Sequence, residues 1–302
     1  MLNPECWEKE IDCQPEDSQN WGELWKISPE ATIEVVQPLA GFVGSDLIAG
    51  ILATQIIDQL DVTLLIDFGT NTEIALWDTK KLWVTSAAGG PAFEGGGISC
   101  GMHAKSGAIF KIDWTADQPD YHFEVIGTAE PRGICGSGMV DAIAYLVEQE
   151  KLNSNGRFQS QVTTEGSFIL DETHKISINN HDIDVFQRAK AAVATGIDCL
   201  LDNAGMNIAN IKKIIVCGAF GISLNIENAR KIGLLPEIAT QNVILAGNTA
   251  LAGCEMLLLN GNDKDLVETI KSKAELINLS NYSDFYDVFL KNLFLKPMRE
   301  QI

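Results

Sequence analysis

The feature that most constrains the fold is an apolar run that ends on a carboxylate and a tight polar turn. The run covers Val62 to Ile66, and the turn reads DFGTNTE over positions 67 to 73. Strand-forming residues resume at Ile74 to Trp77 and again at Leu82 to Thr85. This pattern predicts strands joined by hairpins, with Asp67 at the end of a buried strand. Because a buried carboxylate is costly unless it has a partner or a task, Asp67 is a candidate site residue.

Strands and helices alternate along the rest of the chain. Ser45 is expected to cap a helix over Asp46 to Leu60, and Asp184 with Gln187 resembles a capping box for a long helix that stops at Gly205. The other expected strands lie at Thr32 to Val36, near His122 to Ile126, at Lys213 to Val216 and at Val243 to Ala246, and the other expected helices end near Glu148, near Leu259 and before Pro297. This alternation predicts an α/β protein with layered architecture.

The length of 302 residues suffices for one large domain with a full hydrophobic core. Residues 1–35 are largely polar and carry Trp7, Trp21 and Trp25, so we expect an irregular lead-in whose aromatic side chains pack on another surface. The main domain is expected over 36–302, with a small polar insertion near 151–181.

The chain is strongly acidic, with a formal net charge of -19. Such a surface repels nucleic-acid phosphates and anionic membranes, so we expect neither as a partner. A bound phosphate would need backbone N–H groups, a metal ion or local positive charge. The longest apolar run, Leu47 to Ile57, has eleven residues, whereas a membrane span needs about 20.

Cysteine usage points to a reducing compartment. The chain has seven cysteines, an odd number, and no two form a C-x-x-C motif. The N-terminus has no signal-peptide pattern. A reduced, cytoplasmic protein fits best. We expect neither a zinc site nor an iron–sulfur cluster, because both need clustered cysteines.

The turn after the first buried strand has the chemistry of a phosphate loop. Gly69 brings the backbone close to a ligand, and Thr70, Asn71 and Thr72 add hydroxyl and amide donors. Asp67 is positioned to hold Mg2+ through water. The alternative is an ordinary hairpin with a polar turn.

Each of three further glycine motifs has a functional and a purely structural interpretation. Gly136-Ser137-Gly138 opens a helix, whose N-terminus attracts anions, although Ser137 could be only a cap. Gly218-Ala219-Phe220-Gly221 follows a strand and would let a flat ligand such as adenine approach the backbone, unless it is only a tight connection. The loop 89–97 would carry Glu94 near the ligand, unless it is a solvated loop. An isolated histidine such as His103 is more often structural.

In this order the motifs resemble the second lobe of the actin-like ATPase superfamily, which includes actin, heat-shock chaperone ATPases, sugar kinases and acetate kinases. Longer strings resemble one branch closely, the C-terminal ASKHA-type domain of the ATP-dependent reductive activators of corrinoid proteins. These strings are DFGTNTEIAL (67–76), AAGGPAFEGGGISCGMHAKSGAI (87–109), GICGSGMVDAIAYL (133–146), AKAAVATGIDCLL (189–201), GAFGISLNIENARKIGLLP (218–236) and GNTALAGCEMLL (247–258). The resemblance covers most of the chain.

The resemblance implies an actin-like ATPase (ribonuclease H-like) lobe, with a mixed sheet flanked by helices. The implied cofactors are ATP and Mg2+, and the implied activity is ATP-driven return of a partner's Co(II) corrinoid to Co(I). Asp67 and Glu94 would serve catalysis, with Asp67 also facing the metal. The implied nucleotide contacts are a phosphate loop of Gly69, Thr70, Asn71 and Thr72, ribose or phosphate contacts at Gly136, Ser137 and Gly138, and an adenosine loop of Gly218, Ala219 and Gly221.

Two parts of such an activator are not expected in this sequence: an iron–sulfur domain, and a first lobe with its own phosphate loop. The expected partners are therefore a corrinoid protein and, as a further candidate, a redox or first-lobe protein. Apolar surface left on a single lobe favours a homodimer. Two other functions stay open, namely a non-catalytic interaction module of the same fold and a small-molecule kinase that uses Glu94 as its catalytic acid.

Overall fold

A six-stranded mixed sheet forms the centre of the computed structural model, which describes residues 18–28, 30–31, 33, 35–115, 118–159, 166–220, 222–259 and 264–298. The strand order is β10-β9-β1-β2-β3-β11. The strands are β1 (Thr63–Phe68), β2 (Thr72–Trp77), β3 (Leu82–Ala87), β9 (Lys213–Gly218), β10 (Val243–Gly247) and β11 (Ala274–Leu276). The first three are antiparallel neighbours, β9 runs parallel to β1 and β10, and β11 runs parallel to β3. The predicted α/β class and the predicted hairpins are confirmed.

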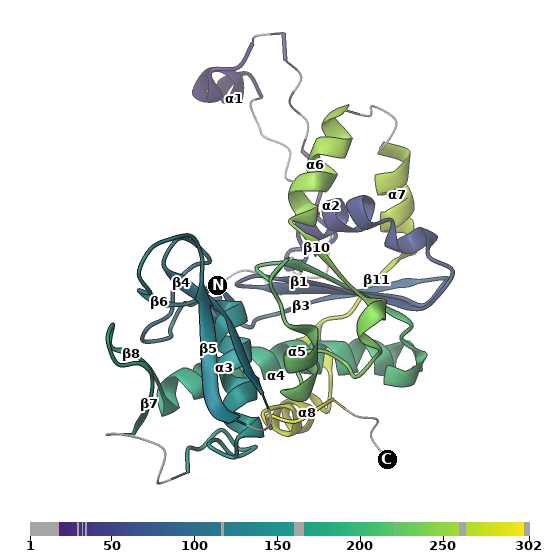
Figure 1. Ribbon diagram of the computed structural model, residues 1–302. Coiled ribbons are helices and arrows are strands. Elements are labelled where there is room, and N and C mark those ends of the chain that lie inside the picture. Colours follow the sequence, from purple (N-terminus) through teal and green to yellow (C-terminus); the bar gives the residue numbers. More distant parts are fainter. Residues whose placement is uncertain are drawn as a thin grey trace.

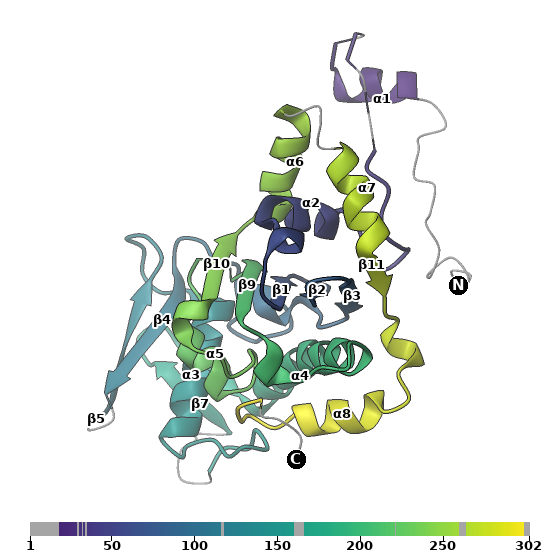
Figure 2. The ribbon, with the colours of Figure 1, turned by 90° about the vertical axis from the view of Figure 1, so that its right-hand side faces the viewer.

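Helices cover both faces of this sheet, as Figure 2 shows. On one face lie α2 (Ser45–Thr54), α6 (Thr249–Leu259) and α7 (Lys264–Lys273), and on the other lie α4 (Asn180–Asn203) and α8 (Phe285–Asn292). The described residues form two hydrophobic cores, one on each face of the sheet, and alternate residues of β1 point into each. Leu64 and Ile66 pack in the larger core with α4, and Leu65 packs in the smaller core with α2. The period-2 alternation of a strand explains why β1 is apolar along its length.

A second, smaller sheet lies beside the first (Figure 1). Its order is β5-β4-β6, with β4 (Ala108–Thr115), β5 (Gln118–Val125) and β6 (Gly133–Ile134). The helix α3 (Gly136–Glu148) follows β6 directly, and the hairpin of β7 (Ser167–Asp171) and β8 (Ile176–Asn179) precedes α4. The hairpin falls in the stretch where the sequence predicts a polar insertion. The remaining short elements are α5 (Ile226–Lys231) and the 3-10 turns η2 (Ile56–Asp58), η3 (Pro91–Glu94), η4 (Ile208–Asn210), η5 (Thr240–Asn242) and η6 (Leu279–Asn281).

Two predicted helix boundaries are wrong. The long helix α4 opens one turn earlier than Asp184, because Asn179 and Asp182 form the capping box. The helix α2 begins after Gly44 rather than after a Ser45 cap, and it ends at Thr54 instead of Leu60. Gln55 takes a left-handed conformation (φ 51°), which breaks the hydrogen-bond ladder before the 3-10 turn η2.

The described part of the N-terminal segment includes the short helix α1 (Ser18–Trp25), where the sequence predicts an irregular lead-in. Trp21 and Trp25 lie four residues apart and their ring centroids are 5.0 Å apart, so they pack along one side of the helix. Figures 1 and 2 both show α1 standing beyond α6 and α7, apart from the body. The predicted strand at Thr32 to Val36 is not formed by its described residues 33, 35 and 36, since the sheet edges are β10 and β11.

The C-terminal segment returns across α4. Gln187 Nε2 donates to the carbonyl of Leu293 (2.8 Å) and Lys190 Nζ donates to that of Phe294 (2.8 Å). Asn292 donates to the Asp198 carboxylate (2.9 Å). These bonds fasten the end of the described chain to the long helix. Among the described residues, no helix combines the length and apolar character that crossing a membrane requires.

Candidate functional site

The candidate site is a pocket of about 760 Å3 at the carboxyl ends of β9 and β10. Five predicted site residues line it together: Glu94, Gly136, Ser137, Gly218 and Ala219. The other lining residues are Phe93, His103, Ala104, Phe110, Ile126, Cys135, Phe220, Ile222, Ser223, Gly247 and Asn248. Parallel strands place their carboxyl ends at one edge of a sheet, which is where open α/β sheets bind ligands.

The loop after β9 begins at Gly218, whose backbone takes the left-handed conformation with φ 76°. A Cβ atom at this position would overlap the carbonyl oxygen of Phe68 and the Asp67 carboxylate. The next amide, Ala219 N, donates to the same Phe68 carbonyl (2.7 Å). Only glycine therefore lets the end of β9 lie this close to the end of β1. Gly221 falls outside the described residues.

The start of α3 forms a second wall. A Cβ atom on Gly136 would overlap the carbonyl oxygen of Phe93, so the helix start and the turn η3 are in direct contact. The Ser137 hydroxyl, which could have been a ligand donor, donates to the carbonyl of Phe110 (2.8 Å). Gly138 is buried against Ile109 and does not line the pocket. The backbone of Gly136 and Ser137, rather than their side chains, is what this helix offers to an anion.

The predicted phosphate loop lies next to the pocket and lies beside two of its lining residues, Gly218 and Glu94. Thr70 Oγ1 donates to the Glu94 carboxylate (3.1 Å to Oε2), and the Thr70 carbonyl accepts from Gly90 N (2.9 Å). Thr70 and Asn71 are exposed, whereas Thr72 is buried and its hydroxyl lies 3.4 Å from the Gly69 carbonyl. Asp67 to Thr72 are not among the described lining residues. The structure thus places Asp67 beside Gly218 and Thr70 beside Glu94.

Two buried carboxyl groups lie side by side at the end of β1, and burial gives them different pKa values. Asp67 lies opposite Glu73 in the antiparallel ladder of β1 and β2. Burial raises the pKa of Asp67 to about 6, with a smaller contribution from the nearby Asp46. Burial raises the pKa of Glu73 to about 8, again with Asp46 contributing, although the Ser86 hydroxyl donates to it (3.1 Å).

With a pKa of about 6, Asp67 is mainly ionised near pH 7, and its single charge fits a cation that takes its other ligands from elsewhere. The described residues contain no group of three or more His, Cys, Asp and Glu side chains arranged to hold a metal ion. Mg2+ commonly takes one or two carboxylates and completes its shell with water and phosphate oxygens. Asp67 at the end of β1 therefore fits Mg2+ that arrives together with a phosphate ligand.

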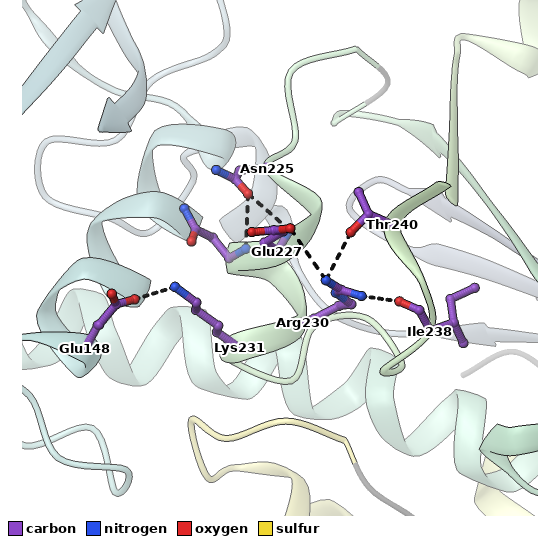
Figure 3. A network of polar contacts seen from close by, with 8 residues as sticks. Glu148, Asn225, Glu227, Arg230, Lys231, Ile238 and Thr240 are labelled. Atoms are coloured by element: carbon purple, nitrogen blue, oxygen red, sulfur yellow. Dashed lines mark hydrogen bonds and ion pairs between the residues drawn. The ribbon is translucent and has the colours of Figure 1, made fainter. Parts of the chain in front are cut away.

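The far end of the 218–225 loop is held by α5, as Figure 3 shows. The Asn225 side chain accepts from the amides of Glu227 and Asn228 (both 3.1 Å) and so caps the helix. The Arg230 guanidinium donates to the Ile238 carbonyl and to Thr240 Oγ1 (3.1 Å), and Lys231 pairs with Glu148 of α3. These contacts hold α5 against α3 on one side and against residues 238–240 on the other. The C-terminal end of the 218–225 loop is therefore fixed in place.

Several pocket residues were missed by sequence reasoning. The rings of Phe93 and Phe220 pack against that of Phe68 beneath the pocket, with ring centroids 4.9 to 5.3 Å apart. No spacing in the sequence signals this cluster, because its members come from three distant segments. Asn248 had a usable signal, since it follows a predicted strand parallel to the one that ends at Gly218. His103 lines the pocket, although a structural role was the expectation from sequence.

Known proteins match this chain over most of its length. A family model described as the C-terminal domain of RACo, the ASKHA domain, matches residues 61–301. Corrinoid activation enzyme RamQ of Eubacterium limosum is 33% identical over 287 residues, covering 88% of this chain and 48% of the relative. A Co(II) methylated amine-specific corrinoid protein reductase of Methanosarcina barkeri is 27% identical over 279 residues, covering 83% of this chain and 49% of the relative.

A solved structure agrees with the sequence matches. The reductive activator for corrinoid,iron-sulfur protein superposes with a TM-score of 0.83 at 32% identity, covering 91% of this chain and 46% of that one. The predicted actin-like lobe is thereby confirmed. The chain spans about half the length of the relatives it matches.

Proposed function

This chain belongs to the family of the C-terminal ASKHA domain of RACo, and from that premise we propose that it binds ATP and Mg2+ and couples them to the reductive activation of a corrinoid protein. The observation that carries the proposal is the convergence of Glu94, the start of α3 and the Gly218 loop on one pocket. Each of these three segments stands out separately in the sequence.

The pocket suits a nucleotide in spite of the acidic surface. Two helices, α3 and α6, begin at its wall, and helix N-termini attract phosphate through backbone N–H groups and the helix dipole. Gly218 and Ala219 leave open backbone beside the apolar side chains of Phe110, Ile126 and Ile222, against which a flat base can lie. The roles that we propose are adenosine contacts at Gly218, Ala219 and Gly221, ribose or phosphate contacts at Gly136 and Ser137, and phosphate contacts at Gly69, Thr70, Asn71 and Thr72. Gly138, which was expected beside the ribose or phosphates, is buried against Ile109 and has no ligand contact in this proposal.

Asp67 and Glu94 are the proposed acidic residues of the reaction. Asp67 would hold Mg2+, which when bound neutralises charge on phosphate oxygens. Glu94, already fixed by the Thr70 hydroxyl, would orient a water molecule towards the terminal phosphate. The Thr70–Glu94 bond keeps the carboxylate on the pocket side of the phosphate loop.

The proposed partner is a corrinoid protein, whose Co(II) accepts one electron to become Co(I). The names of the two relatives described above, a corrinoid activation enzyme and a corrinoid protein reductase, support this partner. We propose that the electron comes from an iron–sulfur cluster outside this sequence, on a redox or first-lobe partner. ATP would favour the conformation of the complex in which the electron transfer proceeds.

We further propose a cytoplasmic homodimer. The five cysteines of the described chain are free thiols, which suits a reducing compartment. Large apolar side chains stand exposed on α6, with Leu251 at 56% and Leu258 at 85% relative exposure. Sedimentation equilibrium would check the dimer, and a monomer at micromolar concentration would refute it.

Nucleotide binding is tested by calorimetric titration with ATP and Mg2+. Ala219 is exposed and lines the pocket, so Ala219→Trp should fill the pocket without disturbing the core. Ala209→Trp, on the exposed turn η4, is the matched control. We expect binding by the unchanged chain and the control, and none by Ala219→Trp. No heat and no thermal shift at millimolar ATP with the unchanged chain would overturn the proposal.

The coupling to corrinoid reduction has a separate readout. A corrinoid protein, a low-potential reductant and this chain are combined with and without ATP, and the Co(II) and Co(I) bands are followed by visible spectroscopy. ATP-dependent gain of Co(I) is the expected result. ATP binding with no change in the spectrum in the presence of the redox partner would instead favour a non-catalytic interaction module.

A further inference from the structure

A buried carboxylate behind the pocket has no role in the function proposed above. Asp141 lies on α3 with 1% relative exposure. Its Oδ2 accepts from the backbone amide of Ile112 on β4 (3.0 Å), and its Oδ1 accepts from Asn228 Nδ2 on α5 (2.7 Å). A charge this deep is retained only where hydrogen bonds compensate for lost hydration, and here both oxygens are used.

The first bond closes an edge of the small sheet. The strand β6 pairs with β4 at Ala108 and Ile109, and the chain then turns into α3. Beyond that point side chains of α3 continue the ladder, since the Ser137 hydroxyl donates to the Phe110 carbonyl and Asp141 accepts from Ile112. Ser137 and Asp141 are four residues apart and so share a helix face. The start of α3 is thereby set against β4, whose Phe110 lines the pocket.

The second bond reaches the loop that follows β9. Asn228 has 3% relative exposure and lies in the first turn of α5, directly after that loop. Its backbone amide donates to the Asn225 side chain, and its own side chain bridges to Asp141 on α3. Figure 3 shows the other anchors of α5, Arg230 and Lys231, on either side of the helix.

We propose that Asp141 is a positioning residue for the nucleotide site, which ties three walls of the pocket to one carboxylate. The walls are β4 at Phe110, the start of α3 at Gly136 and Ser137, and the loop that carries Gly218 and Ala219. Asp141 contacts no ligand itself and fixes the distance between the helix N-terminus and the proposed adenosine loop. This inference rests on the proposed function, because ATP is the ligand that would contact both the N-terminus of α3 and the proposed adenosine loop.

The geometry allows a test by inverting the polarity of one hydrogen bond. In Asn228→Asp two buried carboxylates face each other, so the donor is lost and repulsion appears. In the double variant Asp141→Asn/Asn228→Asp the amide is on α3 and the carboxylate is on α5. The new amide nitrogen then donates to the new carboxylate, while the amide oxygen still accepts from the backbone N–H of Ile112. The inverted pair has nearly the same shape as the original one.

The experiment measures the Kd for ATP by calorimetry and the urea midpoint on the full chain and its variants. Asn228→Asp should weaken ATP binding roughly tenfold or more, and the double variant should return to within about threefold of the unchanged chain. Gln187→Ala is the control for stability, because it removes the bond to Leu293 away from the pocket. It should lower the urea midpoint and leave the Kd unchanged.

Each outcome decides the inference. Normal affinity in folded Asn228→Asp would overturn it, as would a weakened affinity that the double variant fails to restore. If Asn228→Asp does not fold, restoration of both folding and affinity in the double variant supports the positioning role, and a folded double variant with weak binding refutes it. Absence of ATP binding by the unchanged chain overturns the proposed function, and the inference with it.

Discussion

Replacing Glu73 by Gln should remove a large part of the pH dependence of stability. Glu73 is buried with 9% relative exposure on β2, beside Asp67 and near Asp46. Burial raises its pKa from 4.5 to about 8, so the folded protein holds a proton that the unfolded chain has released. Between those two pH values the unfolded state binds fewer protons than the folded state, and the free energy of unfolding therefore falls as pH rises.

The magnitude follows from the two pKa values. Each pH unit inside the window costs up to about 1.4 kcal/mol of unfolding free energy, so Glu73 lowers it by roughly 3 to 4 kcal/mol between pH 5 and pH 8 as an upper figure. Glutamine has nearly the same shape, carries no charge and can still accept from the Ser86 hydroxyl. The variant should match the unchanged chain near pH 5 and exceed it at pH 8.

The assay is urea unfolding, followed by tryptophan fluorescence, at pH 5, 6, 7 and 8. Other carboxylates whose pKa is raised, such as Asp67 and Asp141, are present in both proteins, so the difference between the two proteins reports mainly on Glu73. Glu172→Gln, at an exposed position in the β7–β8 turn, is the control and should change little. A stability difference between the Glu73→Gln variant and the unchanged chain that stays the same at pH 5 and pH 8 would refute the reasoning.

Three further perturbations test other parts of the structure. Asp67→Asn should reduce ATP affinity roughly tenfold when Mg2+ is present and little when it is absent, as calorimetry with and without EDTA would show. Phe93→Ala should lower the free energy of unfolding by about 3–5 kcal/mol, measured in urea, because it removes the centre of the aromatic cluster under the loops. Burial lowers the pKa of Lys190 from 10.5 to about 7, so the unfolded chain binds more protons across that range. Lys190→Met loses the bond to the Phe294 carbonyl but also loses this pH dependence. The stability of the variant relative to the unchanged chain should therefore fall as pH rises from 7 towards 10.5, and a difference that does not vary with pH would contradict this.

The central strands were predictable because local sequence and burial agree there. The apolar runs that became β1, β2, β3, β9 and β10 are bounded by turns, and each has both faces or one face covered by helices. The start of α4 was not predictable in this way. Asp182 is fully buried in its first turn, where it accepts from Ser99 N and from Asn179 N, so a polar residue occupies a position that helical periodicity would assign to an apolar one.

The candidate site was predictable as a set of segments but not as a set of contacts. Glycines at 136 and 218 and the carboxylate of Glu94 stand out in the sequence, and they do meet at one pocket. The sequence could not show that the Ser137 hydroxyl donates to β4 instead of facing a ligand, because this bond depends on where β6 ends. Asp141 and Asn228 are 87 residues apart, and no local rule pairs them.

The meeting of Phe68, Phe93 and Phe220 limits how this site can change over evolutionary time. Phe68 ends β1, Phe93 lies in η3 and Phe220 follows β9, yet all three rings fill one space beneath the pocket. A change in the length of any one of these segments, or in its phenylalanine, would leave a void or a clash under the other two. Substitutions here should therefore be inherited as a set, and a designer who transplants the pocket into another lobe would need to move all three segments together.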